Sequence, residues 1–105
     1  MEVVQYRSVN LPMVSVEFNI CGRFQGLYFM KHCKEECYKL GLCGWIKTGV
    51  RGNIFGKIQG FRSRVDQMMT WLSTKGSPGS QITDCYFHNY EFIRSREFNG
   101  FTLRF

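Results

Sequence analysis

Residues 14–29 read VSVEFNICGRFQGLYF, from Val14 to Phe29. Apolar and polar residues alternate from Val14 as far as Ile20, which predicts a half-buried strand. Two glycines four residues apart, Gly22 and Gly26, then interrupt the alternation. We expect them to form a tight loop that leads directly into a helix. The stretch therefore predicts a strand, a loop and a helix in close succession.

The apolar period changes along the rest of the chain in a readable order. A first helix is expected from Phe29 to Leu40 and a second from Phe61 to Lys75, each ended by a glycine. Further strands are expected at residues 44–48, 53–59, 82–90 and 101–105. The first six of these elements follow the order βαββαβ, which predicts an α+β fold, a ferredoxin-like split βαβ sandwich in which an antiparallel sheet carries two helices on one face. This domain is expected to span residues 14–105, preceded by a short N-terminal arm over residues 1–13.

Composition and charge narrow the classes of protein. The chain has 105 residues, of which 44% are apolar and 16% aromatic, so one domain can form a core without disulfides. No apolar run is long enough to span a membrane and the first residues are not typical of a signal peptide, so we expect a cytoplasmic protein without a membrane partner. The net charge of +6 favours an anionic partner. We expect a monomer.

Five cysteines raise the question of a metal site. Cys33 and Cys37 stand four residues apart beside His32, on one face of the predicted helix. A zinc site would need a second Cys or His pair at ligand spacing, and the sequence has none. We therefore predict no metal site, and we interpret both cysteines as small buried apolar residues.

The loop after the first strand is the candidate site. Successive N–H groups of a glycine-containing loop can point inward, and the loop ends at a helix N-terminus, where the helix dipole is positive. Both features favour a phosphate or a carboxylate. The predicted phosphate-binding residues are Gly22, Arg23, Phe24, Gln25, Gly26, Leu27 and Tyr28.

The sequence from Gly22 to Phe29 resembles the phosphate-loop signature of the small acylphosphatases, G-R-V-Q-G-V-x-F-R. The resemblance continues to the C-terminus through residues 40–47, 52–60, 69–72, 76–78 and 101–105, and covers the chain from about Val14 onward. It implies the same sandwich fold. It also implies hydrolysis of the carboxyl-phosphate bond of small acyl phosphates without a metal or cofactor, with an arginine holding the phosphoryl group and an asparagine orienting the attacking water.

Both catalytic positions depart from the family pattern. The arginine belongs directly after Phe29, where this chain has Met30, and the asparagine belongs directly after Lys47, where it has Thr48. A thioether supplies neither the charge nor the bidentate donors of a guanidinium. Lys31 is one residue further along the helix and should face away from the loop. The resemblance implies that the residue at the position of Arg23 binds the phosphate through its backbone and not through its side chain.

Three functions follow from these observations. The first is an acylphosphatase-like protein that keeps its phosphate-binding loop and has weak or no hydrolysis of acyl phosphates. The second is an active acylphosphatase whose lost residues are compensated. The third is a single-stranded RNA-binding module, because residues 51–56 faintly resemble the R-G-F-G-F core of the RNA-recognition motif. Only Phe55 offers a stacking aromatic there, so we expect a small anion or acyl phosphate as the partner rather than nucleic acid.

Overall fold

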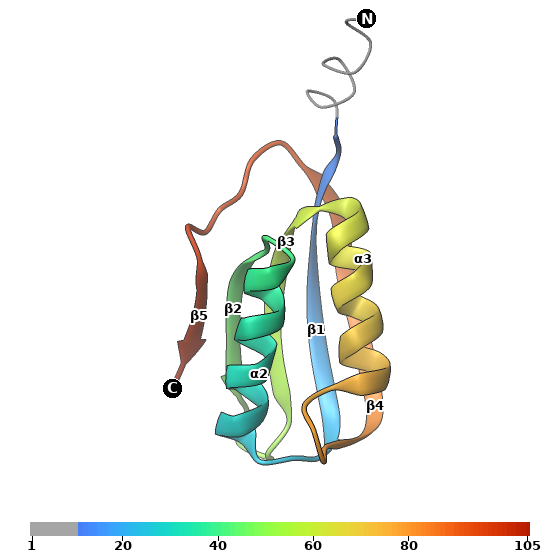
Figure 1. The fold of residues 1–105 in the computed structure, drawn as a ribbon, viewed down its shortest axis with the longest axis vertical. Helices are drawn as coiled ribbons and strands as arrows, with labels where there is room; N and C mark the ends of the chain where they lie inside the picture. Colours follow the sequence, from blue (N-terminus) through green and yellow to red (C-terminus); the bar gives the residue numbers. More distant parts are fainter. Residues whose placement is uncertain (1–10) are drawn as a thin grey trace, which may run out of the picture.

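The computed structural model describes residues 11–105. Strands and helices alternate as the sequence predicts, and the α+β ferredoxin-like fold is confirmed (Figure 1). Of the predicted N-terminal arm, residues 1–10 lie outside the described part, and Met13 already belongs to the first strand. The elements are β1 (Met13–Arg23), α2 (Gly26–Lys39), β2 (Cys43–Thr48), β3 (Ile54–Phe61), α3 (Arg62–Thr70) continued by the π-helical turn η1 (Trp71–Lys75), β4 (Gln81–Ile93) and β5 (Phe101–Arg104).

The sheet has the strand order β4-β1-β3-β2-β5. β1 pairs antiparallel with β3 and β4, and β2 pairs antiparallel with β3. The edge strand β5 runs parallel to β2, so the prediction of an antiparallel sheet was wrong at this edge and the sheet is mixed. The cause is the connection after β4, which crosses one end of the sheet to its opposite edge (Figure 1). β5 arrives there beside a strand that already points the same way.

Both helices cover one face of the sheet (Figure 1). The core residues come from the helices and from the strands that they cover. Alternate residues of β1, from Val14 to Ile20, are fully buried on that face, as the alternation predicts. Phe29 of α2 and Met68 of α3 are fully buried against them. Burying one side chain of this size stabilises the fold by roughly 1.5–3 kcal/mol.

The predicted stop of the first helix is confirmed. Gly41 follows α2 with a φ of 69°, a conformation that favours glycine, and its N–H donates to the Tyr38 carbonyl at 3.1 Å. β2 and β3 form a hairpin, closed by the Gly49 N–H, which donates to the Asn53 carbonyl at 2.7 Å. This turn places the end of β2 beside the start of α2.

Cys33 and Cys37 are fully buried on the inner side of α2, as predicted for small apolar residues. Burial raises the pKa of the Cys37 thiol well above its usual value, and the hydrogen bond and charge of Cys33 raise it further. The Cys37 thiol therefore stays protonated at neutral pH. Among residues 11–105, no helix combines the length and the apolar character that a membrane crossing requires.

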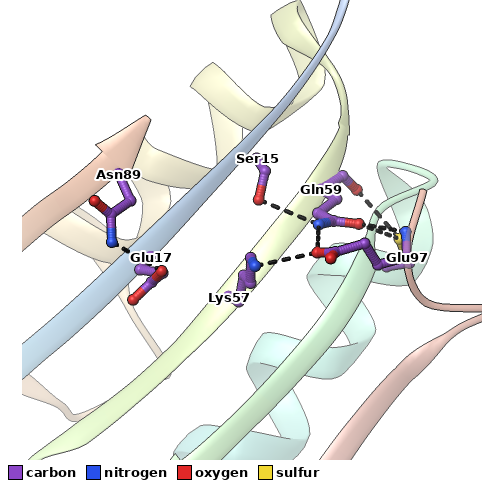
Figure 2. Close-up of polar contacts among 7 residues, drawn as sticks. Ser15, Glu17, Lys57, Gln59, Asn89 and Glu97 are labelled. Carbon is purple, nitrogen blue, oxygen red and sulfur yellow. Dashed lines mark hydrogen bonds and ion pairs between the residues drawn. The ribbon is translucent and has the colours of Figure 1, made fainter. Parts of the chain in front are cut away.

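The face of the sheet away from the helices carries a cluster of polar side chains around the buried Gln59 at one end (Figure 2). Gln59 is fully buried, and its Nε2 donates to Ser15 Oγ at 3.2 Å and to Glu97 Oε1 at 2.6 Å. The Glu97 N–H donates back to Gln59 Oε1 at 2.8 Å, and Lys57 Nζ lies 3.1 Å from Glu97 Oε1. These contacts attach the β4–β5 connection to β3. We call these four residues the Gln59 cluster.

Candidate functional site

The connection between β1 and α2 is shorter than predicted. The predicted loop from Gly22 to Tyr28 is reduced to Phe24 and Gln25, because β1 continues through Arg23 and α2 begins at Gly26. Gly22 and Arg23 are held in the sheet by pairing with β4. A Cβ atom at Gly22 would lie 2.1 Å from the Gln81 carbonyl oxygen, so this glycine serves a close approach of two strands.

The N-terminus of α2 offers unpaired N–H groups. Gln25 precedes the helix in an extended conformation, and its carbonyl accepts the first helical bond from the Phe29 N–H at 2.8 Å. The N–H groups of Gly26, Leu27 and Tyr28 therefore have no partner within the helix. No side chain caps this end, and the first turn holds no acidic residue. The arrangement is electrostatically suited to an anion.

The side chains of the predicted loop do not converge on this helix end. Arg23 and Gln25 are exposed, as are Leu27 and Tyr28. Phe24 is half-buried, and its ring packs against Phe29 with centroids 5.1 Å apart. Any anion at this end would therefore be held by backbone N–H groups, which is the chemistry that the loop sequence predicts.

Met30 and Thr48, which lie 18 residues apart in the sequence, meet beside this helix end. Met30 is 2% exposed, and Thr48 is the last residue of β2. The Thr48 hydroxyl donates to Met30 Sδ at 3.7 Å. A Cβ atom at Gly26 would lie 3.2 Å from Thr48 Oγ1, so the first turn of α2 packs directly over Thr48. The two positions singled out from the sequence are thus neighbours, and both carry neutral side chains.

Neither basic residue considered as a substitute reaches this contact. Lys31 is exposed and lines a groove on the outer side of α2, with Lys34 and Tyr38, as its place one residue beyond Met30 predicts. Arg23 is exposed at the end of β1 and forms no ion pair with another residue of the described range 11–105. No cation is therefore directed at Thr48 by these two side chains.

Two pockets flank the β1–α2 connection. One has a volume of about 280 Å³ and is lined by Phe24, Gln25, Tyr28 and the segment 77–80. The other, of about 440 Å³, lies between the end of β1 and the β2–β3 turn, where Arg51 and Asn53 line it. Neither group was predicted to belong to the anion site, because segment 77–80 is typical of a helix stop and residues 51–53 are typical of a turn.

The RNA-binding alternative rests on Phe55, which lies on the face of the sheet away from the helices. Its ring contacts the edge of Trp45, with centroids 5.8 Å apart and an interplanar angle of 89°. The Arg104 guanidinium lies over the Trp45 ring at 4.5 Å. The RNA-binding alternative stays a prediction.

Comparison with known proteins gives one consistent result. The family model described as acylphosphatase matches residues 16–103. Acylphosphatase-2 of Bos taurus is 36% identical over 98 residues, which cover 93% of this chain and 99% of that protein. Acylphosphatase-1 of Homo sapiens is 40% identical over 91 residues, which cover 87% and 92%.

A solved structure extends the comparison to the fold. The structure of an acylphosphatase from Coxiella burnetii is similar to this chain with a TM-score of 0.76 and 22% identity, covering 89% of this chain and 94% of that one. The split βαβ sandwich inferred from periodicity is thus shared with a protein of that description.

Proposed function

The chain belongs to the acylphosphatase family, and we propose that it binds a phosphate-like anion or an acyl phosphate at the N-terminus of α2 while hydrolysing acyl phosphates weakly or not at all. The phosphate-binding segment is Gly22 to Tyr28, which binds through its backbone. The unpaired N–H groups of residues 26–28 are the principal donors. Binding of this kind requires neither a metal nor an organic cofactor.

The observation that carries the proposal is the contact between Thr48 Oγ1 and Met30 Sδ. The resemblance places a catalytic arginine and a catalytic asparagine at these positions, and the two side chains do lie together next to the helix end. Because Met30 is almost completely buried, its thioether fills the space from which a guanidinium would reach the anion. The site therefore retains backbone N–H groups that can donate to an anion. It lacks the arginine and asparagine side chains that the resemblance assigns to the reaction.

The expected loss of rate is large. An arginine that stabilises a transferring phosphoryl group contributes about a thousandfold or more, through its fixed charge and its two parallel N–H donors. Met30 supplies neither. Thr48 is a smaller change, because its hydroxyl can still bind a water, although from a shorter side chain and with fewer donors than a carboxamide.

The test restores both groups. In a synthetic acyl phosphate assay, the double variant Met30→Arg, Thr48→Asn is expected to be at least about a hundredfold faster than the native chain, because it regains the charge and the water-orienting amide. The matched control is Val50→Arg, Thr74→Asn, which introduces the same two side chains at exposed positions. It is expected to keep the native rate.

The runner-up function gives the opposite result. A native chain that hydrolyses the acyl phosphate within about tenfold of the double variant would show that catalysis is compensated elsewhere, and the chain would then be an active acylphosphatase. A rise in rate in the control as large as in the double variant would show that added charge alone is responsible.

Anion binding is tested separately by thermal shift. A ligand that binds only the folded state raises the melting temperature, by an amount that grows with ligand concentration over Kd. Phosphate and sulfate are expected to raise the melting temperature of the native chain, whereas chloride at equal ionic strength is not. The absence of any shift at tens of millimolar phosphate would contradict the proposed anion site.

A further inference from the structure

The face of the sheet opposite the helices carries one row of residues that runs across all five strands. Strand register places Tyr86 of β4 beside Asn19 of β1, and Asn19 beside Phe55 of β3. Phe55 is in turn paired with Lys47 of β2, and Lys47 with Arg104 of β5. Cross-strand partners project from the same face of a sheet, so the row reads aromatic, amide, aromatic, cation, cation.

From this row we propose that the open face of the sheet binds single-stranded nucleic acid. Bases would stack on Tyr86 and Phe55, and the backbone phosphates would lie along Lys47 and Arg104. This goes beyond the proposed anion site, which lies at the N-terminus of α2 and which a small ligand can fill. It also develops the alternative that residues 51–56 raised from the sequence, where Phe55 was the only stacking residue found.

The aromatic residues are suitably placed for stacking. Tyr86 is 58% exposed, and Phe55 lies two strands away, about 10 Å across the sheet. Trp45 stands next to Phe55, in edge-to-face contact with it. The Arg104 guanidinium covers the Trp45 ring at 4.5 Å, and a planar guanidinium is itself a surface on which a base can stack. Stacking of this kind is worth about 1–3 kcal/mol per base and tolerates any base.

The charge of this face is complementary to a polyanion at the β2–β5 edge. Within residues 11–105, Lys47 and Arg104 form no ion pair, so both charges are available to phosphates. The acidic side chains of this face are engaged or lie toward the β4 edge. Glu17 accepts from Asn89 Nδ2 at 3.0 Å and lies 3.2 Å from His88 Nε2, while Glu97 is paired with Lys57 (Figure 2).

The Gln59 cluster limits the binding surface to one end of this face. The β4–β5 connection is attached over Gln59 and Ser15, so that end of the sheet is covered. The row from Tyr86 to Arg104 lies closer to the other end, next to the β2–β3 turn that holds Arg51. A single strand laid across the sheet would therefore pass below the connection rather than through it.

The main test measures binding of a fluorescently labelled oligouridylate by anisotropy at low salt. Tyr86→Ala is expected to weaken binding about tenfold, because it removes one exposed stacking surface. The matched control is Tyr38→Ala, since Tyr38 is 85% exposed on α2, on the opposite side of the molecule. The control is expected to bind as the native chain does. Equal weakening by the two variants, or no binding by the native chain, would overturn the proposal.

Charge is tested in the same assay with two pairs of substitutions. Lys47→Gln, Arg104→Gln should weaken binding about tenfold and reduce the slope of log K against log salt by about 1.4, because each phosphate contact with a single strand contributes about 0.7. Lys34→Gln, Arg64→Gln removes the same charge from exposed positions on the two helices and should leave affinity and slope nearly unchanged. If both pairs act alike, the attraction is that of the net charge and the proposal fails.

An optical readout locates the ligand on the face. The chain has two tryptophans, Trp45 and Trp71, so Trp71→Phe leaves only Trp45 to fluoresce. Oligouridylate and oligothymidylate are expected to quench this variant, and polyphosphate, which has no bases, is not. Quenching by polyphosphate, or none by the oligonucleotides, would overturn the proposal. Inorganic phosphate at a concentration that fills the α2 site should not displace the oligonucleotide, which separates this proposal from the preceding one.

Discussion

The Gln59 cluster and the contact between Met30 and Thr48 lie at opposite ends of the same sheet. They differ in whether the buried side chain is polar. At one end, Gln59 is fully buried with partners for both its Nε2 and its Oε1. At the other end, a neutral thioether fills the position where the family resemblance places a charged residue. Buried polar groups are thus paired at the end where they order the chain, and a neutral side chain is buried at the end where the resemblance places the reaction.

The physical reason is that the two groups support different things. An unpaired buried amide costs free energy in every folded molecule, so the Gln59 cluster constrains the sequence of three separate segments at once. An arginine near the N-terminus of α2 would stabilise a bound phosphate and is not needed by the fold. With Met30 at this position, no buried side-chain nitrogen or oxygen of the described residues lacks a partner. The residue here can therefore differ from the family pattern without loss of the fold.

Gln59→Leu tests the role of the buried amide and should have the largest effect on stability. The variant leaves the buried Ser15 hydroxyl without its partner, at about 1–3 kcal/mol, so the free energy of unfolding should fall by about 2 kcal/mol. Urea unfolding measures it. Gln67→Leu, at an exposed position of α3, is the matched control and should change stability little. Similar losses in both variants would show that the cluster does not order the fold.

Much of the fold was predictable because its elements are locally encoded. The alternation from Val14 to Ile20 gives β1, and the apolar stripe from Phe29 to Leu40 gives most of α2. The start of α2 at Gly26 was not predictable from this stripe, since residues 26–28 belong to the helix through their backbone and leave their side chains exposed. The direction of β5 was equally hidden, because it depends on where the connection after β4 crosses the sheet.

The loop at the N-terminus of α2 was predictable from its glycines, but the role of Met30 and Thr48 in the candidate site was predictable only through the family resemblance. Nothing local links Met30 to Thr48, which lie 18 residues apart and meet through the packing of α2 on the sheet. The row on the open face was missed for the same reason. Tyr86 and Phe55 are brought to one line by the register of β4 and β3 with β1, and register between distant strands is a tertiary property.

A second substitution tests whether the fold needs the Met30 thioether, and its expected effect on stability is smaller. Met30→Leu replaces a buried side chain by another of nearly the same volume, so the free energy of unfolding should change by less than about 1.5 kcal/mol. Thr48 loses the thioether as a partner but is exposed enough to bond to water. Urea unfolding beside Gln59→Leu gives the contrast directly. A loss for Met30→Leu as large as for Gln59→Leu would mean that the thioether is as necessary to the fold as the buried amide.

The smallest effect concerns the pH dependence of the Gln59 cluster. The hydrogen bond from Lys57 lowers the pKa of the Glu97 carboxyl below its ordinary value of 4.5, and the hydrogen bond from Gln59 and the charge of Lys57 lower it further. A carboxyl whose pKa is lowered by folding stabilises the folded state above its unfolded pKa, and this stabilisation is lost as the pH falls through the folded pKa. The native chain should therefore melt at a higher temperature than Glu97→Gln at pH 6, by a few degrees at most because the group is exposed. The difference should shrink as the pH is lowered from 4.5 toward 3.

Glu91→Gln, at an exposed residue of β4, is the control and should show no such convergence. If the native chain and Glu97→Gln differ by the same amount at every pH, the carboxylate does not hold the β4–β5 connection through its charge. The cluster would then depend on the Gln59 amide and the Glu97 backbone alone.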